Sequence, residues 1–428
     1  MNNEMNNEMK NERKNERNNI YLFTSGKAVS IFGSSIYSFA ISLYVLKITG
    51  SALNFATNLM LSVVPMILIS PVAGVVADRI PKKWLVVGMD LANGLLFSLL
   101  FLYSAKVSLS LPIIYISTIL LNVFTTFFGI GIEAAKPSLV TYEKLIKLNS
   151  LSRLIDSFVA ILGPIMGGVA FAILDIRLFI LFNAISFVFS AVTECFIDYH
   201  FIPDDFDKEP SLKTATWGFI KDLKEGWHFF SNNQSILELF FVFVSLNFLL
   251  GFSVNVPAPY IINQLLDLPS SSFGIINGMF PVGLILGTLT VERVTKKVEF
   301  RKLLITMNAF IAVLAGFIGL PLLLTMSNIS HLLYYSMINI FMGVAIAYVD
   351  IPIMTLLQKE IPKQLLGRVL SLIMSLVKVV LPIALITSGL LLNKIPTVLI
   401  PIIGASIAFA YSIFLLVDSN PVLTDMWS

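Results

Sequence analysis

Three carboxylic acids stand inside long apolar stretches of the sequence: Asp90, Asp156 and Asp350. Two lysines, Lys27 and Lys378, lie in similar surroundings. Ionisable residues inside membrane-spanning segments are costly and usually functional. A carboxyl group that is partly removed from water can take up and release a proton near neutral pH. These residues therefore predict proton-coupled chemistry, with the three acids as the coupling candidates.

Other reactive groups are few. The one cysteine, Cys195, rules out an internal disulfide, and the three histidines are too far apart for metal-ligand spacing. No Walker A phosphate loop occurs, so ATP is not expected to drive the protein. We expect no cofactor and no metal. A membrane enzyme would need a His/Asp, cysteine or metal constellation near the membrane surface, and none is visible.

The elements that must hold these acids are membrane spans. Of the 428 residues, 56% are hydrophobic and 13% are charged, and the mean hydropathy is +0.85. Soluble domains carry about 25% charged residues, so we expect an integral membrane protein surrounded by lipid. The net charge of +3 indicates no nucleic-acid partner, because the basic residues lie in short loops between apolar runs.

The apolar runs predict twelve spans, since a bilayer requires about 20 apolar residues per helix. The longest break follows residue 198 and leaves six spans on each side. The expected fold is therefore all-α, an integral membrane protein of twelve transmembrane helices in two six-helix halves. The predicted spans are 21–46, 53–77, 84–105, 111–133, 152–174, 178–198, 234–258, 272–291, 301–325, 331–357, 367–392 and 396–417.

The segments outside the halves are polar. The first nineteen residues form a low-complexity repeat, which we expect to be disordered. Between the halves, Ile220, Leu223, Trp227 and Phe230 share one helical face, which favours an amphipathic helix on the membrane surface over a disordered linker. The predicted divisions are a disordered N-terminus (1–20), the first half (21–198), a linker with that helix (199–233), the second half (234–418) and a tail (419–428).

Lysine and arginine are distributed unevenly between the two sides of the predicted membrane. With the N-terminus inside the cell, 23 of the 29 basic residues lie in inner segments and only four lie in outer loops. Inner loops of membrane proteins carry this excess of positive charge. We therefore expect a multi-pass protein of a cell membrane, the bacterial plasma membrane, with both termini in the cytoplasm.

The charge pattern of one inner loop occurs twice. "DRIPKK" at 78–83 is echoed by "ERVTKK" at 292–297, an offset of 214 residues, and Arg153 is echoed by Arg368 at an offset of 215. Two matches at nearly the same offset indicate an internal duplication. Parallel six-span halves with a substrate site between them are typical of one kind of secondary transporter.

The loop itself carries a family resemblance. "GVVADRIPKK" resembles the signature between spans 2 and 3 of the major facilitator superfamily, and Pro81 stands where that signature has its second glycine. The matching residues are Gly74, Asp78, Arg79, Lys82 and Lys83. The resemblance implies the major facilitator fold for all twelve spans.

A second motif resembles the antiporter signature of that superfamily. It consists of Gly163, Pro164, Gly167 and Gly168 in "ILGPIMGG". Small residues permit close helix contact, and the proline favours a kink. Span 4 carries Asn122 and lacks the arginine of many proton antiporters. Together with the "EIPKQLLGRVLSL" loop, this is most similar to the macrolide-efflux and enterobactin-exporter branch.

The resemblance implies a conformational latch at the charged turn. Asp78 would face the N-terminus of span 11 at Gly367 and Arg368, where unpaired N–H groups carry a partial positive charge. Arg79 would pair with Glu133 at the inner end of span 4. Such a latch would hold the cytoplasmic side closed. The alternative is that the basic residues act only as orientation signals.

The same architecture places spans 1, 4, 7 and 10 around a central cavity. Asp350 in span 10 is then the first choice for the proton site, unless it forms a structural pair with Lys378. Asp156 is the second choice, Asp90 is expected to be structural, and Lys27 is expected to extend to the inner surface.

Aromatic and amide side chains on spans 1, 4 and 7 are candidates for substrate binding, since such walls suit large amphipathic ligands. Packing inside the bundle or against lipid is the alternative for each of them. The candidates are Tyr37, Tyr44, Phe124, Phe128, Asn247, Phe252 and Tyr260.

The sequence thus predicts a proton-coupled exporter of amphipathic drugs or siderophore-like natural products, acting as a monomer by alternating access. The alternatives are a facilitator or importer of a small nutrient and, from another class, an integral membrane enzyme.

Overall fold

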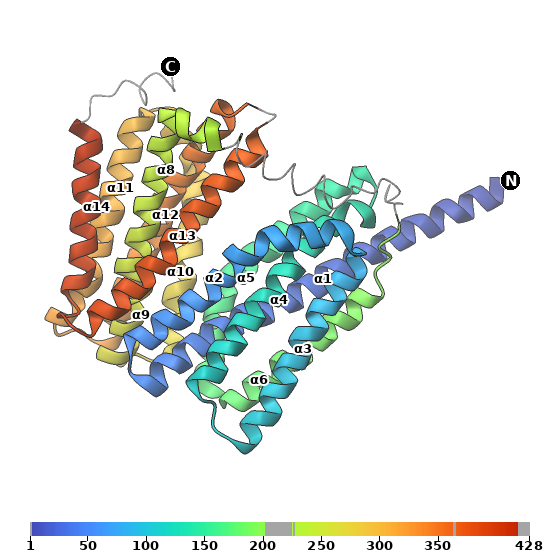
Figure 1. Cartoon of the computed structure of the whole chain (residues 1–428), viewed down its shortest axis with the longest axis horizontal. Coiled ribbons are helices and arrows are strands. Elements are labelled where there is room, and N and C mark those ends of the chain that lie inside the picture. The colour runs from blue at the N-terminus through green and yellow to red at the C-terminus, as the bar shows by residue number, and fades with distance from the viewer. Residues whose placement is uncertain (1, 202–224, 226, 363–364, 418–428) are drawn as a thin grey trace. The chain divides into compact units, whose positions relative to one another are not determined.

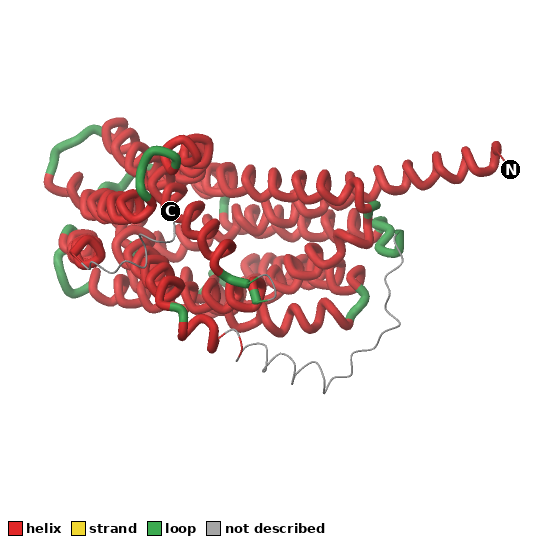
Figure 2. The backbone as a smooth tube through the Cα atoms, turned by 90° about the horizontal axis from the view of Figure 1, so that it is seen from above, coloured by secondary structure: helices red, strands yellow, loops and turns green. Residues whose placement is uncertain are grey.

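The computed structural model describes residues 2–201, 225, 227–362 and 365–417; the side chains of residues 2–12, 78, 366–368 and 371 lie outside this description. Every regular element in the described part is a helix (Figures 1 and 2). In that part, eleven helices are long and apolar enough to cross a membrane, and Leu399–Leu415 is a shorter apolar helix. The all-α membrane fold expected from the sequence is confirmed.

Helices α1 to α6 follow the first six apolar runs, although α1 and α5 begin well before them. Local signals set several ends. The Asp175 carboxylate accepts a hydrogen bond from the Arg177 N–H at 2.9 Å and caps α6, and Gly50 turns the chain after α1 with a φ of +59°. The helices are α1 (Asn2–Thr49), α2 (Ala52–Arg79), α3 (Lys82–Lys106), α4 (Leu111–Leu139), α5 (Tyr142–Ile173) and α6 (Ile176–Cys195).

The N-terminal segment was predicted to be disordered over residues 1–20, but α1 begins at Asn2. Glu16 and Asn19 are buried against the turn between α4 and α5. The Glu16 carboxylate accepts hydrogen bonds from the N–H of Thr141 at 2.8 Å and from the Lys144 ammonium, and the Asn19 amide donates to the Leu139 carbonyl at 3.0 Å. Good helix formers such as Glu, Met, Lys and Arg and these side-chain partners extend the helix beyond its apolar run.

The remaining helices match the last six predicted spans. Span 7 is longer than predicted: Pro257 and Pro259 do not end it, because π-helical turns on both sides carry the helix on to Leu265. The elements are α8 (Gln234–Leu249), η1 (Leu250–Asn255), α9 (Pro257–Tyr260), η2 (Ile261–Leu265), α10 (Ser270–Thr295), α11 (Phe300–Gly316), η3 (Phe317–Leu323), α12 (Asn328–Glu360), α13 (Leu366–Leu392) and α14 (Leu399–Val417). The predicted amphipathic helix of the linker falls mostly outside the described residues; residues 227–232 are helical.

The chain forms two compact units. The first comprises Met1–Tyr44 and Leu61–Lys208, and the second comprises Val45–Met60 and Glu209–Ser428. The predicted halves differ from these units mainly at Val45–Met60, which contains the end of α1, the turn after it and the start of α2. In the second unit this segment packs on a core that includes Phe252 and Leu385, and the Gln264 amide donates to the Leu46 carbonyl at 3.1 Å.

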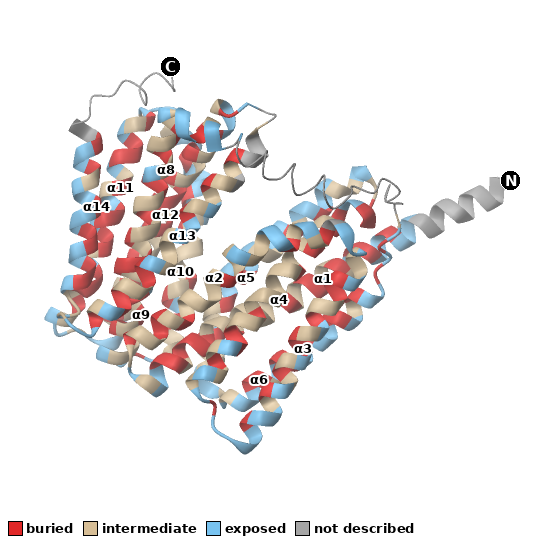
Figure 3. Cartoon of the chain, viewed as in Figure 1, coloured by how far each residue is buried: buried red, intermediate tan, exposed pale blue. Residues whose placement is uncertain are grey.

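Exposed residues recur along the helices of both units (Figure 3), and many of them are large and apolar. Leu68, Leu95, Phe182, Leu289 and Leu333 each have more than half of their surface exposed. Exposed apolar surface costs about 25 cal/mol per Å² in water, and a bilayer removes this cost. These exposed side chains therefore fit contact with lipid.

Candidate functional site

A charged cluster joins three helices of the first unit. The Lys27 ammonium on α1 lies 3.1 Å from Asp156 Oδ1 on α5 and 3.4 Å from Glu133 Oε1 on α4. It also donates to the hydroxyl of Ser152, and the Lys136 ammonium lies 2.6 Å from Glu133 Oε2. We call these five residues the Lys27 cluster.

The Lys27 cluster overturns two expectations. Lys27 does not extend to the surface, because its side chain is only 3% exposed and two carboxylates neutralise its charge inside the unit. Arg79 does not pair with Glu133, because Arg79 is exposed and Glu133 is taken by the two lysines. The Lys27 ammonium balances the charge of Asp156, which distinguishes Asp156 from an acid without a partner.

Asp350 is such an acid. It lies on α12 between fully buried Val349 and the Ile351–Pro352 step, and it has no hydrogen bond or ion pair with any residue that the structure describes. Lys378 on α13 is exposed and makes no ion pair with it, so the alternative of a structural pair is wrong. Asp350 is therefore a partly buried carboxyl group without a counter-charge among the described residues.

Asp90 on α3 is fully buried, and its Oδ1 accepts a hydrogen bond from the Ser30 hydroxyl at 2.9 Å. Close to it lies Glu194 on α6, which is also fully buried and which sequence reasoning missed. The signal was present, since Glu194 is an acid inside the predicted span 178–198. Its place near the end of that span concealed it.

The aromatic candidates fall into two groups. Three of them belong to the packed interiors of the units. The Tyr37 ring meets the edge of Phe97 at a centroid distance of 4.5 Å, Phe252 stacks on Phe248 at 5.5 Å, and Phe128 is 2% exposed. For these three the packing alternative holds. The partly buried candidates are Tyr44, Phe124, Asn247 and Tyr260.

The "ILGPIMGG" motif brings α5 close to α1 in the first unit. A Cβ added at Gly163 would lie 2.2 Å from Ser35 Oγ, and one at Gly167 would lie 3.1 Å from the carbonyl oxygen of Ile36. Gly168 is buried, and Pro164 lies inside the helix. Two glycines one turn apart thus set the spacing between these helices.

The residues of the predicted latch are only partly described. The side chains of Asp78, Gly367 and Arg368 lie outside the described residues. A Cβ at Gly74 would meet no atom within 4 Å, and Lys82 and Lys83 are partly buried at the start of α3. The latch stays a prediction.

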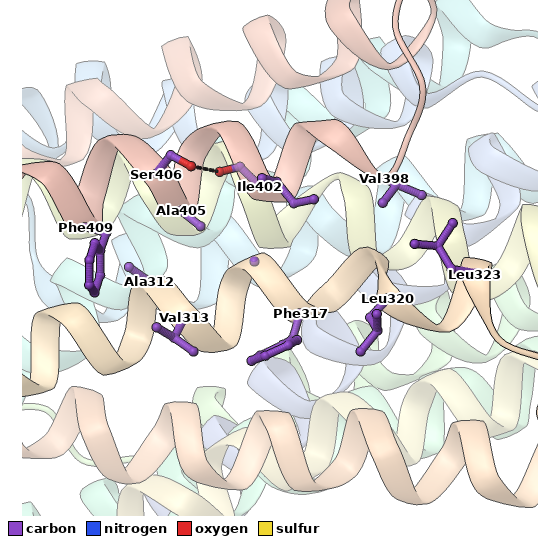
Figure 4. Close-up of a pocket in the computed structure, with 11 residues that line it drawn as sticks. Ala312, Val313, Phe317, Leu320, Leu323, Val398, Ile402, Ala405, Ser406 and Phe409 are labelled. Carbon is purple, nitrogen blue, oxygen red and sulfur yellow. Dashed lines mark hydrogen bonds between the residues drawn. The ribbon is translucent and has the colours of Figure 1, made fainter.

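A cavity of about 400 Å³ lies between α11 with η3 and α14 in the second unit (Figure 4). Its lining is apolar, including Val313, Phe317, Ile402 and Phe409, and the hydroxyl of Ser406 is already bonded to the Ile402 carbonyl at 2.8 Å. No charged side chain lines it, so it offers no proton site. In the described part of the chain, no three His, Cys, Asp or Glu residues are grouped as metal ligands.

Comparison with known sequences gives consistent results. The profile of the Major Facilitator Superfamily matches residues 23–384. Macrolide efflux protein A of Streptococcus pyogenes is 26% identical over 388 residues, which cover 88% of this chain and 89% of that protein. The protein of the same name from Enterococcus faecalis is 24% identical over 346 residues, covering 78% of this chain and 100% of that protein.

Comparison with solved structures concerns the fold alone, because the identities are low. A bacterial homologue of the iron transporter ferroportin, in an inward-facing state, has a TM-score of 0.69 at 16% identity and covers 96% of this chain and 98% of its own. A transporter of the POT family has a TM-score of 0.67 at 11% identity, with coverage of 94% and 96%. These neighbours are membrane transporters, not enzymes.

Proposed function

Because the chain belongs to the Major Facilitator Superfamily, we propose that it is a secondary active transporter that exports amphipathic compounds, macrolides among them, in exchange for protons. The observation that carries this proposal is the similarity to macrolide efflux proteins over most of the chain. It supports a transporter of the efflux type. The coupling ion and the cargo are the finer parts of the proposal.

Proton coupling rests on Asp350. In a partly dry site, a carboxyl group without a cation partner is more stable when it is protonated, whereas water or a cation stabilises the ionised form. A change of conformation that alters the access of water to α12 therefore loads or unloads this group. Asp156 differs in having the Lys27 ammonium at 3.1 Å.

The cargo is proposed to be large and amphipathic. Among the candidate wall residues, the three partly buried aromatic ones and Asn247 supply apolar surface and one amide. Sites of this composition suit ligands with few charges. A strongly anionic cargo would need arginines deep within the spans, whereas the arginines of the predicted spans lie within two residues of a span's start (Arg153, Arg301 and Arg368). Neither lysine deeper in a predicted span offers this: Lys27 is paired inside the first unit and Lys378 is exposed.

Membrane placement follows the charge distribution. We place both termini in the cytoplasm of a bacterial cell, with alternating access controlled by the predicted latch of Gly74, Asp78, Arg79, Lys82, Lys83, Gly367 and Arg368. If the latch exists, an Asp78→Asn variant changes both transport and the accessibility of single cysteines placed on the inner face. An unchanged accessibility pattern would remove the latch from the mechanism.

The experiment uses inside-out vesicles with an acidic interior. Macrolides, tetracyclines, cationic dyes and catecholate siderophores are added one at a time, and proton release and uptake of the compound are measured. The wild type is compared with Asp350→Asn and with Glu299→Gln, an exposed acid of the same unit. We expect release with at least one class, its loss in Asp350→Asn, and wild-type behaviour in Glu299→Gln.

Two outcomes change the proposal. Release that survives in Asp350→Asn keeps proton antiport and moves the coupling site to another acid. Compound uptake without proton release would indicate a facilitator or another coupling ion instead of proton antiport. Uptake only in right-side-out vesicles would indicate import instead of export.

A further inference from the structure

Two buried carboxyl groups face each other across α3 and α6 in the first unit, next to α1. Asp90 and Glu194 are both fully buried, and each has one oxygen, Oδ2 of Asp90 and Oε2 of Glu194, without a hydrogen-bond partner among the described residues. Ser190 on α6 interacts with both carboxyl groups. Neither acid forms an ion pair in the described part of the chain.

The Ser190 hydroxyl contacts more oxygen atoms than it has hydrogens to donate. Its Oγ lies 2.9 Å from the Gly26 carbonyl oxygen and 3.1 Å from Glu194 Oε1. A serine hydroxyl has one hydrogen, and a carbonyl oxygen can only accept. When the Ser190 hydrogen goes to Gly26, the contact with Glu194 is a hydrogen bond only if the Glu194 carboxyl group is protonated and donates to Ser190.

The groups around the two acids agree with a protonated state. The titratable neighbours are Tyr199 and Cys195, and neither is a cation. Burial raises the pKa of the Tyr199 hydroxyl, so this group stays neutral. Lys27, the nearest lysine along α1, is bound within its own cluster. An ionised carboxylate in such surroundings would be an uncompensated buried charge, which is strongly unfavourable.

The backbone of α1 is shaped to this pair. A Cβ added at Gly26 would lie 3.0 Å from Glu194 Cγ and 3.1 Å from its Oε1. The glycine allows α1 to approach α6 closely enough for its carbonyl to bind Ser190. One helical turn beyond Asp90, the Asn93 side chain is buried with its amide nitrogen and oxygen both unpartnered in the described part. Polar groups thus continue along the same interface.

We propose that Asp90, Ser190 and Glu194 form a proton-binding site within the first unit, with the bound proton on Glu194, and that transport exchanges this proton. The binding part stands on the geometry alone, while the exchange part depends on the proposed proton antiport. The site is separate from Asp350, which lies in the second unit.

Infrared spectroscopy of the lipid-reconstituted protein tests the binding part, because the carbonyl stretch of a protonated carboxyl group is distinct from the bands of a carboxylate. At neutral pH we expect the wild type to show a protonated band that is missing in Glu194→Gln and unchanged in Glu299→Gln. We also expect Ser190→Ala, which keeps both acids, to shift this band. A band that is identical in the wild type, Glu194→Gln and Ser190→Ala would overturn the proposal.

A transport measurement tests the exchange part in the same vesicles. Glu194→Gln resembles the protonated state and is expected to fold, and it should lose part of the pH dependence of export. An unchanged pH profile, together with a confirmed infrared band, would mean that the proton is structural and would overturn exchange. If the wild type shows no proton-driven export, the proposed function fails, and the infrared result still decides whether the site binds a proton.

Discussion

The Lys27 cluster predicts an asymmetry between removing its buried cation and removing its acids. The Lys27 side chain is 3% exposed, whereas the Asp156 and Glu133 side chains are 42% and 54% exposed. Lys27→Met leaves two acids that water reaches, and Lys136 still neutralises Glu133. The loss is that of partly exposed ion pairs, about 1–2 kcal/mol in total.

Removing the acids has a larger effect. The double variant Glu133→Gln/Asp156→Asn leaves a buried ammonium group with no counter-charge, which costs about 3–5 kcal/mol. The difference from Lys27→Met is about 1–4 kcal/mol, and for a unit of this size it corresponds to a midpoint about 2–16 °C lower, at roughly 2–4 °C per kcal/mol.

The assay is thermal unfolding of the detergent-solubilised protein, followed by intrinsic fluorescence. Adding Lys27→Met to the double variant should recover most of the lost stability, because it removes the uncompensated charge. If Lys27→Met melts as low as the double variant, or if the triple variant melts lower still, then the uncompensated ammonium charge is not the main cause of the instability and the reasoning is wrong.

Three further predictions follow from packing and hydrogen bonding. Gly163→Ala should lower the free energy of unfolding by about 1–3 kcal/mol through overpacking, and adding Ser35→Ala should restore it. As a control, Gly129→Ala should raise the free energy of unfolding by up to about 1 kcal/mol, because its Cβ meets no atom within 4 Å. The same thermal assay measures all three variants. Tyr37→Ala should cost about 3–5 kcal/mol as a core truncation, while Tyr37→Phe should leave substrate affinity unchanged in a binding titration; weaker binding at unchanged stability would return Tyr37 to the substrate wall. Glu16→Gln should cost about 1.5–3 kcal/mol through weaker charge-assisted hydrogen bonds, and amide exchange at the α4–α5 turn should become faster, which would not occur if the N-terminal helix did not contact that turn.

The spans were predictable because the bilayer imposes one requirement, a run of about 20 apolar residues, on every helix. That requirement says nothing about which side chains face the interior of a unit. Tyr37 and Tyr44 are seven residues apart and therefore lie on nearly the same face of α1. Tyr37 is nevertheless enclosed by Phe97 and Phe179, whereas Tyr44 is only partly buried. The helices that pack beside α1 at each position along its length therefore decide which tyrosine is buried.

The partners of buried charges were not predictable for a similar reason. Lys27 meets Glu133 and Asp156, which follow it by 106 and 129 residues, and no periodicity in the sequence connects such positions. Glu16 and Asn19 were assigned to a disordered repeat on composition. Their contacts with the α4–α5 turn depend on the packing of three helices, which composition does not contain.

The acids of this chain differ in what neutralises them, and this difference leads to a prediction about coupling. Asp156 has a cation at 3.1 Å, Glu194 is inferred to hold a proton between helices, and Asp350 has no partner in the described part of the chain. If Glu194 and Asp350 both exchange protons, Glu194→Gln lowers the number of protons exchanged per substrate and does not abolish export. Each exchanged proton contributes about 1.36 kcal/mol per pH unit. The substrate gradient attained at a difference of one pH unit should therefore fall about tenfold in Glu194→Gln, since about 1.4 kcal/mol is a factor of ten. This gradient is measured directly in vesicles held at a difference of one pH unit and loaded with substrate until the net flux reverses. An unchanged reversal point would mean that Asp350 couples transport alone.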